Sequence, residues 1–138
     1  MKKLVLILLG FIVILSIGCS TSKNDSNENP LIGAWVITSS KYVSQDTTID
    51  KTTFENPTVK LLTKKHFAFG SQSGENKVWG GGGEYSLVGD TYSETVKYHG
   101  VSQAIGMTVK YKSTLNGDIW TISRLDMNAT ETWKRIAE

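Results

Sequence analysis

The sequence predicts an all-β domain, and more specifically an eight-stranded antiparallel up-and-down barrel. Residues 31–138 contain no long stretch with the 3.6-residue apolar period of an amphipathic helix. They contain short runs of β-branched and aromatic residues, separated by turn residues at spacings typical of barrels and sandwiches. Almost every link is short and hairpin-like, which favours an up-and-down order over a Greek key. Closing the barrel would remove the exposed edges of an open sheet.

Eight strands are expected in this region. The first runs from Trp35 to Val43 and leads into a polar crossover over residues 44–56, whose shape the sequence does not define. Lys64-Lys65 and Asn116-Gly117 are expected to be two-residue hairpin turns, the second of type I′. The remaining strands are expected over residues 58–63, 66–71, 84–88, 91–98, 107–115, 118–125 and 129–136.

Four consecutive glycines, Gly80–Gly83, precede the central hairpin, which turns at Gly89-Asp90. Such a run in a strand marks a bulge, a sharp bend or the close approach of another segment. A phosphate-binding loop is excluded, because a strand follows the glycines where that loop needs a helix. Trp79, directly before the run, is either a core residue or an aromatic at the barrel rim.

The first 18 residues predict a lipoprotein signal peptide. Lys2 and Lys3 precede an apolar run from Leu4 to Ile17, which is shorter than the about 20 residues of a membrane-spanning helix. The run ends before Gly18 and Cys19 in a pattern that resembles a bacterial lipobox. That resemblance implies cleavage after Gly18 and acylation of Cys19, for example with palmitate. Without acylation, cleavage at the same place would release a secreted protein with a free thiol.

Residues 19–30 form a polar segment that is expected to be a flexible tether to the domain at 31–138. Ser20, directly after the cysteine, resembles the sorting signal for the outer membrane in Gram-negative lipoproteins, and the side that the domain faces stays open. Cys19 is the single cysteine, so no internal disulfide can form. Without Lys2 and Lys3, basic and acidic residues are equal in number, so we expect no nucleic-acid partner. The lipid on Cys19 is expected to anchor the protein to a membrane.

Two motifs at the ends of the domain carry a family resemblance. Gly33-Ala34-Trp35, together with Arg135 in Trp133-Lys134-Arg135, resembles the calycin signature of lipocalins and fatty-acid-binding proteins. The glycine-rich hairpin and the closing segment 131–135 further resemble lipocalin-like domains of exported Bacteroidetes proteins. The resemblance implies that Trp35 packs at the closed end of the barrel with Arg135 over it, and that Gly33, Trp35, Trp133 and Arg135 serve barrel closure. The chain departs from secreted lipocalins in having no disulfide and no evident helix before its last strand.

An eight-stranded barrel is just wide enough to be filled by side chains or to hold one small ligand. Strand alternation places Glu94 on a face with tyrosines, and it places Glu131 and Arg135 on the face of Trp133. In one interpretation, Glu131 or Glu94 neutralises Arg135 at a plugged barrel end. In the other, the polar groups and the aromatic rings orient a small amphipathic ligand at the open end. The candidate cavity residues are Phe67, Phe69, Tyr85, Tyr92, Glu94, Tyr98, Tyr111 and Glu131.

No motif indicates catalysis. His66 and His99 are the only histidines and belong to no metal-like cluster, and no Gly-x-Ser-x-Gly elbow is present. We therefore expect neither an enzyme nor a metal or cofactor. The leading hypothesis is a membrane-anchored binding protein for a small apolar or amphipathic molecule. The alternative is a packed barrel that acts as an envelope interaction module for a protein or a glycan, and the sequence indicates no oligomeric state.

Overall fold

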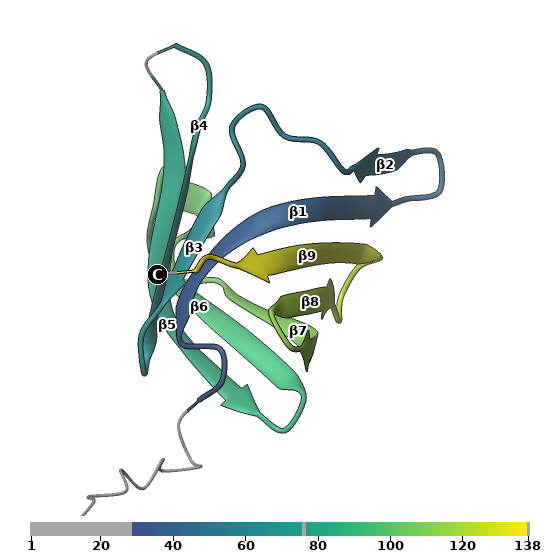
Figure 1. Cartoon of the computed structure of the whole chain (residues 1–138). Helices are drawn as coiled ribbons and strands as arrows, with labels where there is room; N and C mark the ends of the chain where they lie inside the picture. The colour runs from purple at the N-terminus through teal and green to yellow at the C-terminus, as the bar shows by residue number, and fades with distance from the viewer. Residues whose placement is uncertain (1–28, 76, 138) are drawn as a thin grey trace, which may run out of the picture.

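A computed structural model describes residues 29–75 and 77–137 of the 138-residue chain. The expected signal peptide, Cys19 and most of the expected tether lie outside the described residues. The domain is built from strands alone, apart from one short 3-10 turn (Figure 1). The elements are β1 (Gly33–Val43), β2 (Thr48–Lys51), β3 (Val59–Leu62), β4 (His66–Gln72), β5 (Val78–Val88), β6 (Thr91–His99), η1 (Ser102–Ala104), β7 (Thr108–Asn116), β8 (Ile119–Arg124) and β9 (Ala129–Arg135).

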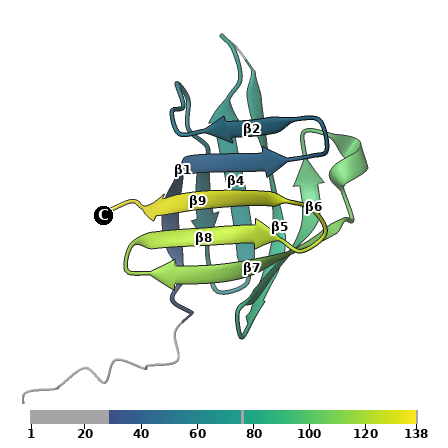
Figure 2. The same cartoon turned by 90° about the vertical axis from the view of Figure 1, so that its right-hand side faces the viewer.

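The strands form a closed antiparallel barrel, as the sequence predicts. From β3 to β9 each strand pairs with the next one in the chain, and β1 pairs with β3 on one side and β9 on the other. One strand, β2, is additional to the eight that close the barrel, and it lies in the crossover whose shape the sequence did not define. It pairs with the far half of β1, so it extends the wall rather than entering the barrel (Figure 2).

The hairpin turns match the predictions in two of three places. The hairpin β5–β6 turns at Gly89-Asp90, where Gly89 has φ of 61°, and Lys64-Lys65 link β3 to β4. The prediction for the β7–β8 turn is wrong by one residue. Asn116 pairs with Ile119, so the loop is Gly117-Asp118. Of these two loop residues only Gly117 takes a positive φ, 57°, which fits a type II′ turn with glycine first rather than type I′.

The four glycines lie inside β5, where other backbones approach too closely for side chains. A Cβ on Gly80 would lie 2.6 Å from the carbonyl oxygen of Phe69, and one on Gly83 would overlap the carbonyl oxygen of Thr95. The β5–β6 register shifts between Gly82 and Gly83, which leaves Lys97 of β6 as an extra, bulged residue. The run therefore provides both the close approach and the bulge that the sequence suggested.

Aromatic side chains fill one half of the barrel. Trp120 lies at the centre of this core, with its ring 5.4 Å from that of Trp35, 5.0 Å from Tyr92 and 6.2 Å from Trp133. These rings leave no room for a ligand along the axis of this half. The buried apolar residues are Leu31, Trp35, Ile37, Leu62, Phe67, Tyr85, Tyr92, Val96, Trp120, Ile122 and Trp133.

Arg135 closes the packed end of the barrel. Its guanidinium lies 4.2 Å from the ring centroid of Trp35, where the family resemblance places it, and donates hydrogen bonds to the carbonyl oxygens of Ile32 and Pro30 at 2.9 and 2.7 Å. The expectation that Glu94 or Glu131 neutralises Arg135 is wrong, because its carboxylate partner is Asp118 at 3.3 Å. Asp118 lies in the β7–β8 turn, which reaches the same end of the barrel as the end of β9.

Candidate binding site in the open half of the barrel

The end of the barrel away from Trp35 contains a partly open cavity of about 130 Å³. Its lining residues come from seven of the eight barrel strands or their immediate flanks, so the barrel as a whole forms the cavity, and no single loop does. The lining residues are Ile37, Thr58, Lys60, Phe69, Trp79, Glu94, Tyr111, Glu131 and Trp133. We call this cavity the cup.

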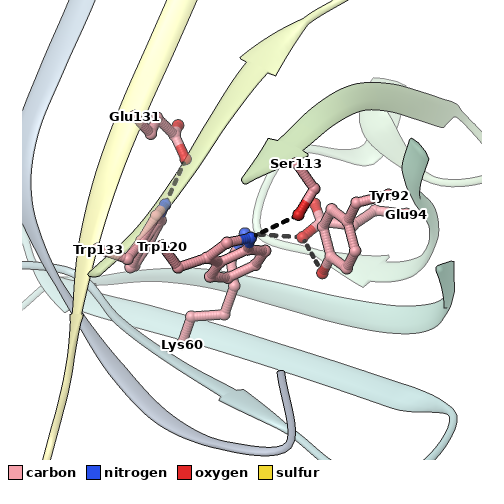
Figure 3. A network of polar contacts seen from close by, with 7 residues as sticks. All are labelled: Lys60, Tyr92, Glu94, Ser113, Trp120, Glu131 and Trp133. Atoms are coloured by element: carbon pink, nitrogen blue, oxygen red, sulfur yellow. Dashed lines mark hydrogen bonds and ion pairs between the residues drawn. The ribbon is translucent and has the colours of Figure 1, made fainter. Parts of the chain in front are cut away.

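A buried ion pair forms the floor of the cup. Lys60 Nζ lies 2.7 Å from Glu94 Oε1, and the two side chains are only 5% and 7% exposed. The hydroxyl of Tyr92 donates a second hydrogen bond to the same carboxylate oxygen, also at 2.7 Å (Figure 3). Removing either charge would leave the other one buried without a counterion, so the two residues act as a unit.

Aromatic rings surround the ammonium group of Lys60. Its Nζ lies 4.7 Å from the ring centroid of Trp133, 5.6 Å from Trp120, 5.9 Å from Tyr92 and 6.0 Å from Phe67. The faces of aromatic rings attract cations, and the attraction is stronger where water is excluded. These contacts and the Glu94 pair together offset the cost of removing the lysine from water.

The two tryptophans beside the cup use their indole N–H groups. Trp133 Nε1 donates to Glu131 Oε2 at 3.1 Å, and Trp120 Nε1 donates to Ser113 Oγ at 2.9 Å (Figure 3). Ser113 points inward because β7 alternates strictly between half-buried and exposed residues. Glu131 is thereby fixed at the wall of the cup, with its second oxygen available.

Two further oxygen atoms face the cup. Within the described residues, Glu94 Oε2 and the Tyr111 hydroxyl take part in none of the protein hydrogen bonds, and no buried side-chain nitrogen or oxygen lacks a partner there. Both atoms are therefore accessible from the cup. The cup thus combines apolar rings with carboxylate and phenol oxygens that a ligand can reach.

Burial and the carboxylates keep the tyrosines protonated. Burial is the main cause that raises the pKa of Tyr92 and Tyr111 far above its ordinary value, with a further contribution from the negative charge of Glu94. Burial also raises the pKa of Tyr85.

At the rim, Arg124 donates two hydrogen bonds to Asp126, at 2.8 and 2.6 Å, and these lower the pKa of Asp126 and raise that of Arg124.

The raised tyrosine pKa values predict a loss of stability in alkali. Tyrosines of the unfolded chain ionise near pH 10, whereas the folded protein holds these protons to higher pH. Above about pH 10 the unfolded state therefore binds fewer protons, and the free energy of unfolding falls as the pH rises, by at most about 1.4 kcal/mol per pH unit for each of Tyr92 and Tyr111. This stability is fully present below about pH 10.

A spectrophotometric titration checks this expectation. The tyrosinate absorbance of Tyr85, Tyr92 and Tyr111 should appear together with unfolding, measured in parallel by tryptophan fluorescence, and Tyr111→Phe should make the alkaline loss of stability less steep. Ionisation of all five tyrosines in a chain that is still folded would contradict the expectation.

Two solved structures share this architecture. A lipocalin-like protein from Bacteroides uniformis superimposes with a TM-score of 0.58 at 13% sequence identity, over 77% of this chain and 98% of that one. The fold is lipocalin-like. An uncharacterized protein from Bacteroides eggerthii gives a TM-score of 0.56 at 12% identity, over 76% of this chain and 98% of that one. No protein-family model and no curated protein matches the sequence.

The lipocalin-like barrel brings four of the eight candidate cavity residues to the cup, namely Phe69, Glu94, Tyr111 and Glu131. Phe67 and Tyr92 lie in the packed core beneath it. Tyr85 also lies away from the cup, because its hydroxyl donates to the carbonyl oxygen of Thr63 at 2.6 Å near the closed end. The barrel interior is therefore divided into a packed half and an open half.

The placement of Tyr98 inside the barrel is wrong. Its side chain is 55% exposed and lies over Gly82 on the outer surface. The bulge at Lys97 reverses the alternation of β6, so that His99 takes the inward position instead, 5.7 Å from the ring of Phe69 and 5.5 Å from that of Trp79. Trp79 itself is exposed at the barrel rim, which agrees with the second of the two interpretations of that residue.

Lys60 is the main residue of the site that the sequence reasoning missed. Its signal was the register of the β3–β4 hairpin. A two-residue turn at Lys64-Lys65 sets Lys60 opposite Phe69, and partners in an antiparallel pair point to the same face. Once Phe69 is assigned to the interior, Lys60 must point inward as well.

In the described part of the chain, no group of three or more histidine, cysteine, aspartate or glutamate side chains is arranged to hold a metal ion. Likewise, no helix described there is both long and apolar enough to cross a membrane.

Proposed function

We propose that this protein is a non-enzymatic, lipid-anchored binding protein that holds one small amphipathic molecule in the cup. The observation that carries the proposal is the composition of the cavity. Its walls are the aromatic rings of Phe69, Trp79 and Trp133, and a few polar groups converge on it from Glu94 and Glu131. Small-molecule sites in proteins combine apolar walls with a few placed polar groups in this way.

The volume of the cup limits the size of the ligand. About 130 Å³ is well below the roughly 300–1,000 Å³ of pockets for drug-sized molecules, and it is close to the about 150 Å³ of a cavity that holds benzene. The packed tryptophans below exclude an acyl chain that runs down the barrel axis. The ligand is therefore a molecule of a few heavy atoms, or the end of a larger one that projects from the mouth.

Native mass spectrometry of the protein from the organism that encodes it tests this function. We expect a small molecule to co-purify at a ratio of about one to one. Thr58→Trp, which adds a large ring to the wall of the cup, should abolish this co-purification. The matched control is Thr114→Trp on the exposed outer face of β7, which should retain the ligand. Equal ligand content in both variants would contradict binding in the cup.

A second candidate function is an envelope interaction module. Five exposed apolar residues lie on adjacent segments at the open end, at the start of β5, the end of β6 and the following loop: Val78, Tyr98, Val101, Ile105 and Met107. Such a group of apolar side chains is typical of surfaces that contact another molecule. An empty barrel in the mass spectrometry experiment would favour this function over small-molecule binding.

The lipid anchor at Cys19 rests on the sequence pattern before it, and we propose that it holds the protein at the outer membrane. With Cys19→Ala, we expect metabolic labelling by a palmitate analogue to disappear and the protein to leave the membrane fraction. Ser20→Ala at the neighbouring position is the control and should keep the label. Labelling that persists in the Cys19 variant would show that another residue carries the lipid.

A further inference from the structure

We infer that the cup selects a small organic cation, an amphipathic molecule with an ammonium group, over neutral and anionic molecules of the same shape. This selectivity depends on the proposed binding function and names the ligand class of the same site. Three features of the cup point to it: its charge balance, the direction of its hydrogen-bonding groups and its aromatic walls.

The charge balance of the cup is negative. Three of its lining residues are of the types that are charged near neutral pH: Lys60, Glu94 and Glu131. Lys60 and Glu94 neutralise each other at 2.7 Å, so the field of the lysine is largely cancelled. Glu131 forms no ion pair within the described residues, and the nearby Arg124 is already bound to Asp126 through two hydrogen bonds. One carboxylate is therefore left to act on a ligand.

The free carboxylate oxygens that face the cup are acceptors, and the hydroxyls of Thr58 and Tyr111 beside them can both donate and accept. Glu131 Oε2 receives the indole N–H of Trp133, which leaves Oε1 without a protein partner in the described region, and Glu94 Oε2 is accessible in the same way. Both are carboxylate oxygens, which only accept hydrogen bonds when ionised. An ammonium group has three donors and would form charge-assisted bonds to them, whereas an anionic ligand would be repelled.

The walls of the cup are suited to a cation. The ring centroids of Phe69 and Trp79, which both line the cup, lie 4.9 Å apart with their planes tilted by 54°, and the ring of His99 is perpendicular to that of Trp79. The protein already shows this type of contact within itself, because Lys60 Nζ lies 4.7 Å from the ring centroid of Trp133. The ammonium group of a ligand above this floor would lie close to Trp133, Trp79 and the carboxylate of Glu131, which all line the same small cavity.

Three probes of one shape test the selectivity: butylammonium, 1-butanol and butanoate. Each is titrated into the protein expressed from its full-length sequence, and binding is followed by the NMR signal of the Trp133 indole N–H, which is hydrogen-bonded to Glu131. We expect butylammonium to bind at least about tenfold more tightly than butanol and butanoate to bind most weakly. Glu131→Gln should reduce the preference for butylammonium over butanol to less than about threefold, because the amide keeps the shape of the side chain but removes its charge.

Glu84→Gln, on the exposed outer face of β5, is the control and should leave all three affinities unchanged. Butanol or butanoate binding as tightly as butylammonium would overturn the cation selectivity while the cup stands as a binding site. A preference for butylammonium that survives Glu131→Gln would also overturn the assignment to this carboxylate. If none of the three probes binds at any soluble concentration, the binding function itself fails and the selectivity fails with it.

Discussion

Replacing Lys60 by methionine is expected to lower the free energy of unfolding by about 3–5 kcal/mol. The substitution leaves the Glu94 carboxylate 7% exposed among aromatic rings, with the hydroxyl of Tyr92 as its one remaining donor within the described residues. A buried charge without a counterion is one of the few changes that costs so much in a single substitution. Urea denaturation followed by tryptophan fluorescence measures the loss, because Trp120 and Trp133 surround the substituted group.

A matched substitution separates burial from charge. Lys41 forms an ion pair with Asp50 at 3.8 Å in which both side chains are about half exposed, so Lys41→Met should change the stability by less than about 1 kcal/mol. The double variant Lys60→Met/Glu94→Gln should recover most of the loss, since its neutral amide still accepts the hydrogen bond of Tyr92. A Lys60→Met variant that loses no more than Lys41→Met would show that the buried pair contributes nothing special to stability.

The barrel could be predicted from the sequence because its determinants are local. Alternation in β7 and turn residues such as Gly89-Asp90 act within one hairpin, and successive hairpins are enough to define an up-and-down order. The strand β2 could not be predicted, because it lacks such a local pattern. All four of its residues, Thr48–Lys51, are exposed, so no apolar pattern marks it, and its pairing with β1 is a matter of backbone hydrogen bonds.

The details of the site depend on contacts between distant segments, and there the sequence was a weaker guide. Alternation assigned the inward position to Tyr98, but His99 takes it, because the β5–β6 register shifts at Gly82 and Gly83 and leaves Lys97 as a bulged residue. The position of Lys60 was accessible from hairpin register alone. The partner of Arg135 could not be predicted in this way, because only the closed barrel shows that the β7–β8 turn brings Asp118 next to Arg135.

Replacing Arg135 by alanine is expected to lower the free energy of unfolding by about 2–4 kcal/mol. The guanidinium covers the fully buried ring of Trp35 at 4.2 Å and binds two carbonyl oxygens of the segment that leads into β1. Its loss uncovers Trp35 and leaves the carbonyl oxygen of Ile32 without this donor. Gly33 has no side chain to fill the gap, and its φ of 133° disfavours any residue that could.

Two further variants show which contact of Arg135 matters. Asp118 is 73% exposed, so Asp118→Asn should cost less than about 1 kcal/mol if the ion pair is a minor contribution. Arg135→Lys keeps the charge but loses the planar group that stacks on Trp35 and reaches two carbonyl oxygens, so it should behave nearly like Arg135→Ala. If Asp118→Asn is as damaging as Arg135→Ala, or if Arg135→Lys is harmless, charge rather than stacking closes the barrel. In that case the surface ion pair with Asp118 would hold Gly33 and Trp35 in position, and the stacking of Arg135 on Trp35 would contribute little.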